Sequence, residues 1–397
     1  MQQDRTSASR QRDSLSVFQV MPREMYFGEL RATSIDLCVR DLVSFSRFRA
    51  TTRIFAEATE DGFPGFMVDR LPAAGSMATF RRANHVARAA RQARPDIIVV
   101  QQHLPTAAAI ALRLPWAKIV LHTHNFQKSY ADAPAFGTMF RQAARSRRYR
   151  QLAGIIHVSE ACRNLFERAW PVGLPGCVVN NGLDFDVWHP ATKRDQQILY
   201  IGRCAPEKGT LETAIALRKI LPGFPDWRTR FILSAVGTHA RYFEQTRDVL
   251  AELGPQAEIS VQRPYGEIRQ ACEHAAIAIV PSICREAFGR TALEAHAGGA
   301  ALISSGSGGL SEISGQAALF TPDVTARTIE DAVKTLLTDP ALRKRLAHEG
   351  AGRVRERFDI RSQAARLDGF LLDVAGRCNQ AASGGTKADK EIRKAAA

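Results

Sequence analysis

The sequence predicts an α/β protein made of two consecutive units, each a parallel β-sheet covered by helices on both faces. Short β-branched apolar runs alternate with helical stretches along most of the chain, and a polar, proline-containing segment interrupts this alternation at residues 184–196. The strands read as continuous apolar runs, which is typical of strands that are buried on both faces. The 397 residues also exceed the size at which a single hydrophobic core keeps growing.

In the first unit, residues 95–103 (PDIIVVQQH) predict a strand, TAAAIALRLP predicts a helix, and residues 117–125 (AKIVLHTHN) predict the next strand. After a basic helix, residues 153–159 (AGIIHVS) predict a further strand. The following stretch, SEACRNLFERAW, predicts a helix with Ser159 as its N-cap. This order of strand, helix and strand indicates a parallel sheet.

The second unit begins with a strand at residues 197–203 (QILYIGR) and continues through RFILSAVG, AEISVQ, AAIAIVPS and AALISSGSGG. Helices then follow to about Phe358. The two units are therefore interpreted as two Rossmann-like domains in tandem. We predict five segments: a disordered N-terminus at 1–15, a first domain at 16–188, a second domain at 189–360, a C-terminal helix at 361–378 and a disordered tail at 379–397.

The composition is that of a soluble globular protein, with 45% apolar and 24% charged residues. The first twenty residues carry charge where a signal peptide needs an apolar core, and no run of 18 apolar residues occurs, so we expect a cytoplasmic protein. The seven cysteines are scattered and never spaced as CxxC. We therefore expect reduced thiols, without a disulfide framework or a zinc site.

The net charge of +14 is concentrated in residues 71–150, which contain 13 lysines and arginines but only two acidic residues, Asp96 and Asp132. In FRQAARSRRYRQ the spacing predicts that three arginines share one face of a helix, namely Arg141, Arg145 and Arg148. Such a face suits a solvated helix, an anionic membrane surface or nucleic acid. Nucleic acid is disfavoured because no zinc-finger spacing, aromatic RNA-binding signature or basic recognition helix accompanies the charge.

Two cations follow the first strand of the second unit, in GRCAPEKG at residues 202–209. In parallel α/β sheets, ligands bind beyond the carboxyl ends of the strands. Arg203 and Lys208 on one short loop would suit a diphosphate, which arginine grips as a fork and lysine meets as a point charge. A basic surface loop without a ligand would have the same sequence.

Two glutamates eight positions apart mark PSICREAFGRTALEAHAGG at residues 281–299. The segment predicts a strand end, a turn that contains Glu286, and a helix that contains Glu294 and stops at two glycines. Glu294 could accept hydrogen bonds from ribose hydroxyls, and Glu286 would face a sugar. Phosphate oxygens would be favoured by the first backbone amides of the helix, those of Gly289, Arg290 and Thr291. The alternative is that neither glutamate binds a ligand. Glu286 would then be an acid that favours the helix dipole, and Glu294 an exposed glutamate on the helix.

A glycine-rich turn at residues 304–313 (SSGSGGLSEI) should bring backbone close to a ligand or to the facing helix. The spacing GxGxxG does not occur anywhere in the chain, which argues against a dinucleotide oxidoreductase.

Taken together, these segments resemble the retaining glycosyltransferases of family 4, which have the GT-B fold. The resemblance rests on ILYIGRCAPEKG, PSICREAFGRTALEA, AGGAALISSGSGGLSEI, HVSE and NNGLD, and is specific over residues 150–358. It implies two Rossmann-like domains with parallel sheets facing across a cleft. It further implies that Glu286 and Glu294 contact a nucleotide-sugar donor and that Arg203 and Lys208 bind its diphosphate. Members usually need no divalent metal, so no metal and no cofactor are expected.

The first domain departs from the family pattern. Members commonly have a Gly-Gly loop near the donor phosphates, whereas VFQVMPREMYFGELRA offers only Gly28, which is our candidate for that loop. Members also place a histidine near the transferred sugar, and LHTHN offers His122 and His124. We favour His124 because it lies further beyond the end of the strand. By this resemblance, Glu286 and His124 are the candidate catalytic residues.

The resemblance implies transfer of a sugar from a nucleoside-diphosphate sugar to a glycan or lipid-linked acceptor, with the anomeric configuration kept, in bacterial cell-surface polysaccharide or lipopolysaccharide core synthesis. The basic segment 71–150 would then hold the enzyme peripherally on the anionic inner face of the cell membrane, and no nucleic-acid partner is expected. The alternatives are a soluble transferase that acts on a small acceptor, a GT-B nucleotide-sugar 2-epimerase and a nonenzymatic nucleic-acid binder.

Overall fold

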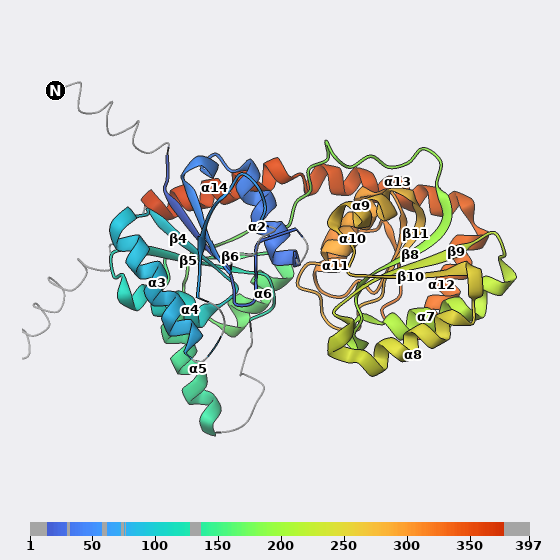
Figure 1. Cartoon of the computed structure of the whole chain (residues 1–397), viewed down its shortest axis with the longest axis horizontal. Coiled ribbons are helices and arrows are strands. Elements are labelled where there is room, and N and C mark those ends of the chain that lie inside the picture. The colour runs from blue at the N-terminus through green and yellow to red at the C-terminus, as the bar shows by residue number, and fades with distance from the viewer. Residues whose placement is uncertain are drawn as a thin grey trace, which may run out of the picture.

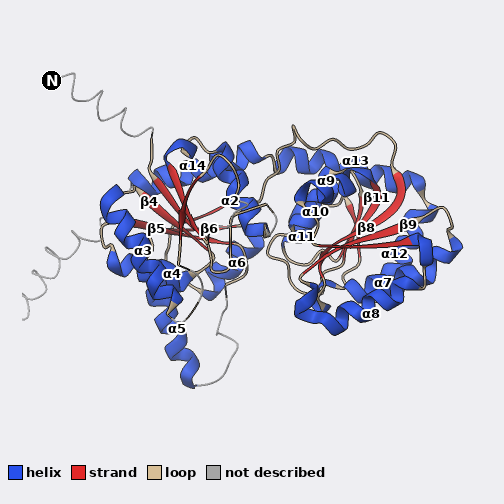
Figure 2. Ribbon diagram, viewed as in Figure 1, coloured by secondary structure: helices blue, strands red, loops and turns tan. Residues whose placement is uncertain are grey.

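The computed structural model describes residues 14–29, 32–57, 62–72, 75, 77–127 and 136–376. Within these residues the chain forms two α/β domains that lie next to each other, each with a parallel sheet between layers of helices (Figure 1, Figure 2). The predicted fold class is confirmed. Residues 1–13 and 377–397, which include nearly all of the two predicted disordered ends, lie outside the described residues.

The first domain contains a seven-stranded parallel sheet with the order β3-β2-β1-β4-β5-β6-β7. The strand order reverses beside β1, which creates the type of crevice at the carboxyl ends where ligands bind in such sheets. Its strands are β1 (Val17–Val20), β2 (Thr52–Ala56), β3 (Met67–Arg70), β4 (Ile97–Gln101), β5 (Lys118–Thr123), β6 (Gly154–His157) and β7 (Gly176–Val178). Its helices are α2 (Ser34–Phe45), α3 (Ala78–Ala93), α4 (Leu104–Arg113), α5 (Phe136–Tyr149) and α6 (Glu160–Ala169).

The second domain contains a six-stranded parallel sheet with the order β10-β9-β8-β11-β12-β13. Its strands are β8 (Asp195–Arg203), β9 (Arg228–Ser234), β10 (Ala257–Val261), β11 (Ala275–Val280), β12 (Ala301–Ser304) and β13 (Ala318–Phe320). Its helices are α7 (Thr210–Ile220), α8 (Ala240–Ala251), α9 (Tyr265–His274), α10 (Arg290–Ala297), α11 (Gly309–Ser314), α12 (Ala326–Thr338) and α13 (Pro340–Arg357). The predicted boundary between residues 188 and 189 falls in the segment that joins β7 to β8.

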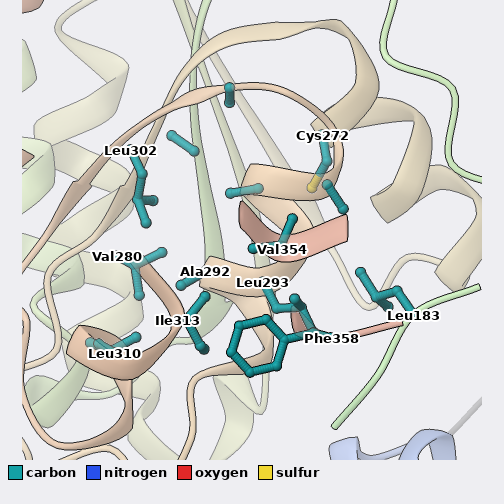
Figure 3. Packing of buried hydrophobic residues seen from close by; sticks show 14 of the residues in the cluster. Leu183, Cys272, Val280, Ala292, Leu293, Leu302, Leu310, Ile313, Val354 and Phe358 are labelled. Carbon is teal, nitrogen blue, oxygen red and sulfur yellow. The ribbon is translucent and has the colours of Figure 1, made fainter. Parts of the chain in front are cut away.

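The apolar face of α10 anchors this helix in the core of the second domain. Ala292 and Leu293 are fully buried in one cluster with Leu310, Ile313 and Phe358 (Figure 3). Burying a leucine side chain stabilises a fold by about 1.5–3 kcal/mol. The start of α10 is therefore fixed by packing below it, which matters because the two candidate glutamates flank that start.

The last helix returns to the first domain. Helix α14 (Ile360–Gly376) packs against α2, as Figure 1 shows. The carboxylate of Asp368 accepts hydrogen bonds from Ser46 Oγ at 2.6 Å and from the backbone amide of Arg47 at 2.9 Å. The C-terminal helix thus ties the two domains together.

No helix in the described residues has the length and apolarity that crossing a bilayer requires.

Two local expectations have different outcomes. Ser159 caps α6 as predicted, because its hydroxyl accepts a hydrogen bond from the backbone amide of Cys162 at 3.0 Å. The prediction that Arg141, Arg145 and Arg148 form one exposed face of α5 fails at Arg145, which is only partly exposed. Arg145 turns inward, where its guanidinium lies 5.6 Å from the centre of the Trp170 ring and donates a hydrogen bond to Gln127. Burial of the long arginine stem against an aromatic side chain overrides the helical spacing.

Candidate functional site

Three loops meet at the carboxyl ends of β8, β11 and β12. The first contains a short 3₁₀ turn at Pro206–Lys208, and its Glu207 carbonyl accepts the backbone amides of Ile283 and Cys284 at 3.0 and 3.1 Å. The carbonyl of Glu286 accepts the backbone amide of Gly309 at 2.8 Å. These bonds join the three loops into one surface, which we call the loop platform (residues 203–209, 281–289 and 305–309).

Lys208 and Glu286 form a salt bridge at the centre of the loop platform, although 78 positions separate them in sequence. Glu286 Oε1 also accepts a hydrogen bond from Ser282 Oγ at 2.6 Å. The two charged side chains are 17% and 18% exposed, so they are reachable from solvent but largely shielded from it. Lys208, which was expected to bind the diphosphate, therefore contacts Glu286, which was expected to face the sugar.

Arg203 lies at the exposed rim of the platform. Its Nη2 lies 3.0 Å from Glu207 Oε1, and its side chain is 51% exposed. A hydrogen bond from its own backbone amide, helped by the Arg203 guanidinium, holds the pKa of Glu207 below its ordinary value. Exposed ion pairs contribute only about 0–1 kcal/mol, so an anionic ligand can draw Arg203 away at little cost.

The start of α10 supplies donors to the same platform. Gly289 has a φ of 104°, and a Cβ at this position would overlap the Leu310 side chain. Only glycine meets both conditions. No side chain in the described residues caps this helix start. The first backbone amides, at Arg290 and Thr291, therefore keep hydrogen bonds available for an anion.

The side chain of Arg290 belongs to a buried network between the domains. It is 7% exposed, with Nε 2.8 Å from Glu294 Oε1 and Nη2 2.9 Å from Asp41 Oδ2. Asp41 lies on α2 of the first domain. The hydroxyl of Tyr265 donates to Glu294 Oε1 at 3.0 Å and accepts from Arg290 Nη2 at 3.0 Å. The side chain of Arg290 thus has a role that was not expected, since only its backbone amide was assigned to the donor.

Glu294, the candidate for the ribose hydroxyls, is 5% exposed. Burial raises its pKa, and the neighbouring Arg290 and Tyr265 act in the opposite direction. Both side-chain hydrogen bonds that it accepts within the described chain fall on Oε1. Oε2 therefore keeps its lone pairs for a ligand, while Arg290 and Tyr265 fix the orientation of the carboxylate.

Arg290→Ala is expected to lower the free energy of unfolding by about 3–5 kcal/mol, because it leaves the buried carboxylate of Glu294 without its cation. Asp41 would keep its second partner, Arg40. Urea titration followed by circular dichroism measures the loss. The control is Arg345→Ala, which removes an exposed arginine that also pairs with a glutamate four positions on, Glu349, and should change stability by less than about 1 kcal/mol. Equal losses in the two variants would contradict the network.

On the first domain, His124 follows β5 and is partly exposed. Its Nε2 lies 2.7 Å from Gln101 Oε1, and its backbone amide donates to Gln102 Oε1 at 2.6 Å. Burial lowers the pKa of His124 to about 3, so the ring is neutral at pH 7. The neighbouring His122 is only 1% exposed. Of the two histidines, His124 is the one that solvent reaches.

Gly28 lies in the loop between β1 and α2, where it is buried and forms an isolated antiparallel bridge with Gly62. Its role in donor binding stays a prediction. Sequence reasoning missed Ser282, Asp41 and Tyr265 as partners of the candidate residues. Tyr265 is the first residue of α9. No spacing in the sequence links Asp41 or Tyr265 to Glu294, whereas Ser282 precedes Glu286 by four positions in the same segment.

Two family models match consecutive parts of the chain. "Glycosyltransferase Family 4" matches residues 49–187, and "Glycosyl transferases group 1" matches residues 185–353. A glycogen synthase of Mycobacterium tuberculosis is 28% identical over 287 residues, which cover 69% of this chain and 68% of that protein. A lipopolysaccharide 1,2-N-acetylglucosaminetransferase of Salmonella typhimurium is 26% identical over 233 residues, which cover 55% and 56%.

Solved structures share the two-domain architecture. The crystal structure of Anabaena HepE in complex with UDP and glucose superposes with a TM-score of 0.73 at 16% identity, and covers 90% of this chain and 99% of that chain. This similarity shows the fold. The two matching family models together span residues 49–353, which include every candidate residue of the loop platform.

Proposed function

Because this chain belongs to family 4 of the glycosyltransferases, which are nucleotide-sugar-dependent enzymes of the GT-B type, we propose that it transfers a sugar from a nucleoside diphosphate to a glycan or lipid-linked acceptor with retention of the anomeric configuration. The observation that carries this proposal is the contact of Lys208 with Glu286 beside the uncapped start of α10. A cation, free backbone amides and a sugar-facing carboxylate meet there at the carboxyl ends of a parallel sheet.

In the proposed reaction, the bond between the anomeric carbon and the diphosphate oxygen breaks, and that oxygen gains negative charge. Lys208, Arg203 and the amides at Arg290 and Thr291 stabilise this charge. Glu286 orients the sugar hydroxyls or stabilises positive charge near the anomeric carbon. The acceptor hydroxyl attacks from the side that the diphosphate leaves, and the phosphate takes its proton, so no enzymic nucleophile is required.

We propose that the transfer step itself proceeds without a divalent metal, because the cations and the helix start can neutralise the leaving diphosphate. Glu294 would accept hydrogen bonds from the ribose through Oε2, while Arg290 and Tyr265 hold its other oxygen. His124 would face the transferred sugar as a neutral hydrogen-bonding group. Binding of the donor tests these assignments most directly, because the structure gives fewer candidate contacts for the acceptor than for the donor.

The acceptor is proposed to lie at an anionic membrane face. An open groove of about 650 Å³ runs between α3, α4 and α5, and Arg147 and Arg148 line it. Two apolar side chains in its wall are strongly exposed, Phe140 at 80% and Leu112 at 67%. Apolar side chains beside arginines are typical of surfaces that dock on anionic lipid. The relative from Salmonella is named for a lipopolysaccharide acceptor, which supports a cell-surface glycan.

The proposed reaction is tested by incubating the protein with a panel of nucleoside-diphosphate sugars with and without candidate acceptors. Proton NMR then reports the anomeric configuration of the first product. Acceptor-dependent transfer with the donor configuration kept supports the proposal. Conversion of the donor to its epimer without an acceptor would support the 2-epimerase alternative, and an inverted product would overturn retention.

Membrane docking is tested with a double charge reversal in the groove, Arg147→Glu with Arg148→Glu. We expect co-sedimentation with phosphatidylglycerol vesicles to fall at least about tenfold, because each arginine near an anionic surface contributes about 1 kcal/mol. The control is Arg218→Glu, an exposed arginine on α7 of the second domain. Equal losses in both variants, or equal binding to phosphatidylcholine vesicles, would contradict docking through this groove.

A further inference from the structure

Three side chains that can bind metals converge in the first domain, at the carboxyl end of β5. Cys38 lies on α2, His122 on β5 and His124 directly after β5. Cys38 Sγ and one ring nitrogen of each histidine all lie within 4.8 Å of one another. The cysteine and the histidines are more than eighty positions apart in sequence. The expectation of no zinc site rested on the local spacing of cysteines, which does not detect a cluster of this kind.

The cluster contains a buried polar atom without a partner. Cys38 and His122 are each 1% exposed, and His122 Nε2 has no hydrogen-bond partner within the described part of the chain. Leaving a buried polar atom unpaired costs about 1–3 kcal/mol. The rings of His122 and His124 lie 4.3 Å apart, so the orphan atom is next to a second ligand-type side chain. A metal ion between them would remove this cost.

A chain of carboxamides fixes the state of His124. The Gln101 side-chain amide donates to Gln19 Oε1 at 2.7 Å, so Gln101 Oε1 is the atom that faces His124 Nε2 at 2.7 Å. The His124 Nε2 must then carry the proton, which leaves the lone pair on Nδ1. Histidines that bind metals characteristically donate their other ring N–H to an oxygen in this way, because that bond orients the ring.

We propose that Cys38, His122 and His124 bind one divalent ion of borderline softness, with Zn²⁺ as the best-matched ion. One thiolate and two imidazoles are ligands that zinc prefers, whereas magnesium and calcium prefer oxygen. Three protein ligands leave one position of a tetrahedral ion for water. That position faces the side of His124, since His124 is the one member of the cluster that solvent reaches.

The proposed site goes beyond sugar transfer. The ion would be held by the first domain, whereas the cations proposed to bind the donor diphosphate, Arg203 and Lys208, are on the second domain. An ion bound to His124 would prevent its ring from contacting the transferred sugar, and sugar transfer would be slower. This consequence rests on the proposed function. Binding of the ion does not rest on it, and the test below measures binding alone.

The test uses the full-length protein, stripped of metal with a chelator and titrated with Co²⁺, a spectroscopic substitute for Zn²⁺. We expect one equivalent to bind, with a tetrahedral visible spectrum and a thiolate-to-cobalt charge-transfer band, and Zn²⁺ to displace it. Cys38→Ala should lose the charge-transfer band and weaken binding at least tenfold. His124→Ala should weaken binding while it keeps the band at high Co²⁺.

The control is Cys284→Ala, because Cys284 is a partly exposed thiol within the loop platform and the obvious place for adventitious metal binding. This variant should keep both the stoichiometry and the band. Melting temperatures of the metal-free variants show that each is folded. Absence of stoichiometric binding, or loss of the band in Cys284→Ala but not in Cys38→Ala, would overturn the proposal.

Discussion

Lys208→Ala is expected to lower kcat for sugar transfer by about 100–1,000-fold, which is the usual effect of removing one group that stabilises charge developing in the transition state. The Lys208 ammonium contacts Glu286 in the absence of donor, and both side chains are less than one-fifth exposed. In this shielded position its charge acts on the departing diphosphate far more strongly than it would in water. KM should change less than kcat, because charge builds mainly after the donor binds.

The matched control for this kinetic measurement is Lys219→Ala. Lys219 is a lysine of the same domain that also pairs with a glutamate, Glu330, but its side chain is 60% exposed and lies on α7. This variant should retain the activity of the wild type within about twofold. If Lys208→Ala kept its kcat and lost only affinity for the donor, the lysine would be a binding group without a role in the departure of the diphosphate.

The protein is expected to lose stability steeply between pH 6.5 and pH 4 because several histidines are buried in their neutral form. Burial, with a contribution from Arg353, lowers the pKa of His296 to about 4, and burial with Arg163 does the same for His157. The pKa of His103 is also lowered to about 4, chiefly by burial. In this pH range the unfolded chain binds protons at these side chains and the folded chain does not, so falling pH favours unfolding.

Each of the fully buried histidines, His157 and His296, should cost about 2 kcal/mol of unfolding free energy between pH 7 and pH 5. Urea unfolding at the two pH values measures the difference. In His296→Gln the pH-dependent loss should shrink by about 2 kcal/mol, whatever the variant does to stability at pH 7. His274→Gln, which alters an exposed side chain, should show the loss of the wild type. A loss that is unchanged in His296→Gln would contradict this account.

The two parallel sheets could be predicted because each strand carries its own local signal. Runs such as AAIAIV and KIVLHT are apolar and β-branched, and both form buried parallel strands, β11 and β5. The helix start at Gly289 and the stop at Gly298 could be predicted for the same reason, since glycine marks both positions. Lys208 and Glu286 could be assigned to one site because the carboxyl ends of parallel strands meet at one edge of the sheet.

The contacts between the two domains could not be predicted in this way. Asp41 and Arg290 form an ion pair although 249 positions separate them, and no pattern in the sequence links the two positions. The same holds for Ser159, whose hydroxyl caps α6 and also donates to the Ala287 carbonyl of the second domain at 2.6 Å. Local pattern specifies the cap, whereas the partner in the other domain depends on how the domains pack.

The inward turn of Arg145 illustrates a second limit. Helical spacing correctly indicates which residues share a face, but it does not indicate whether a long cationic side chain lies flat on an aromatic ring. Trp170, which is fully buried, and Gln127 together hold Arg145 against the first domain. The arginines that line the groove are Arg147 and Arg148, of which the spacing had placed only Arg148 on the predicted face.

The central claim is that the loop platform binds a nucleoside-diphosphate sugar, and thermal stabilisation against a panel of UDP, GDP, ADP and CMP sugars tests it most directly. We predict a rise of several degrees with one diphosphate nucleotide, which is lost in Glu294→Ala, reduced in Lys208→Ala and kept in Lys219→Ala. No shift with any donor would contradict the assignment of the platform as the donor site. A shift in Lys208→Ala and Glu294→Ala that equals the shift of the wild type would contradict it as well.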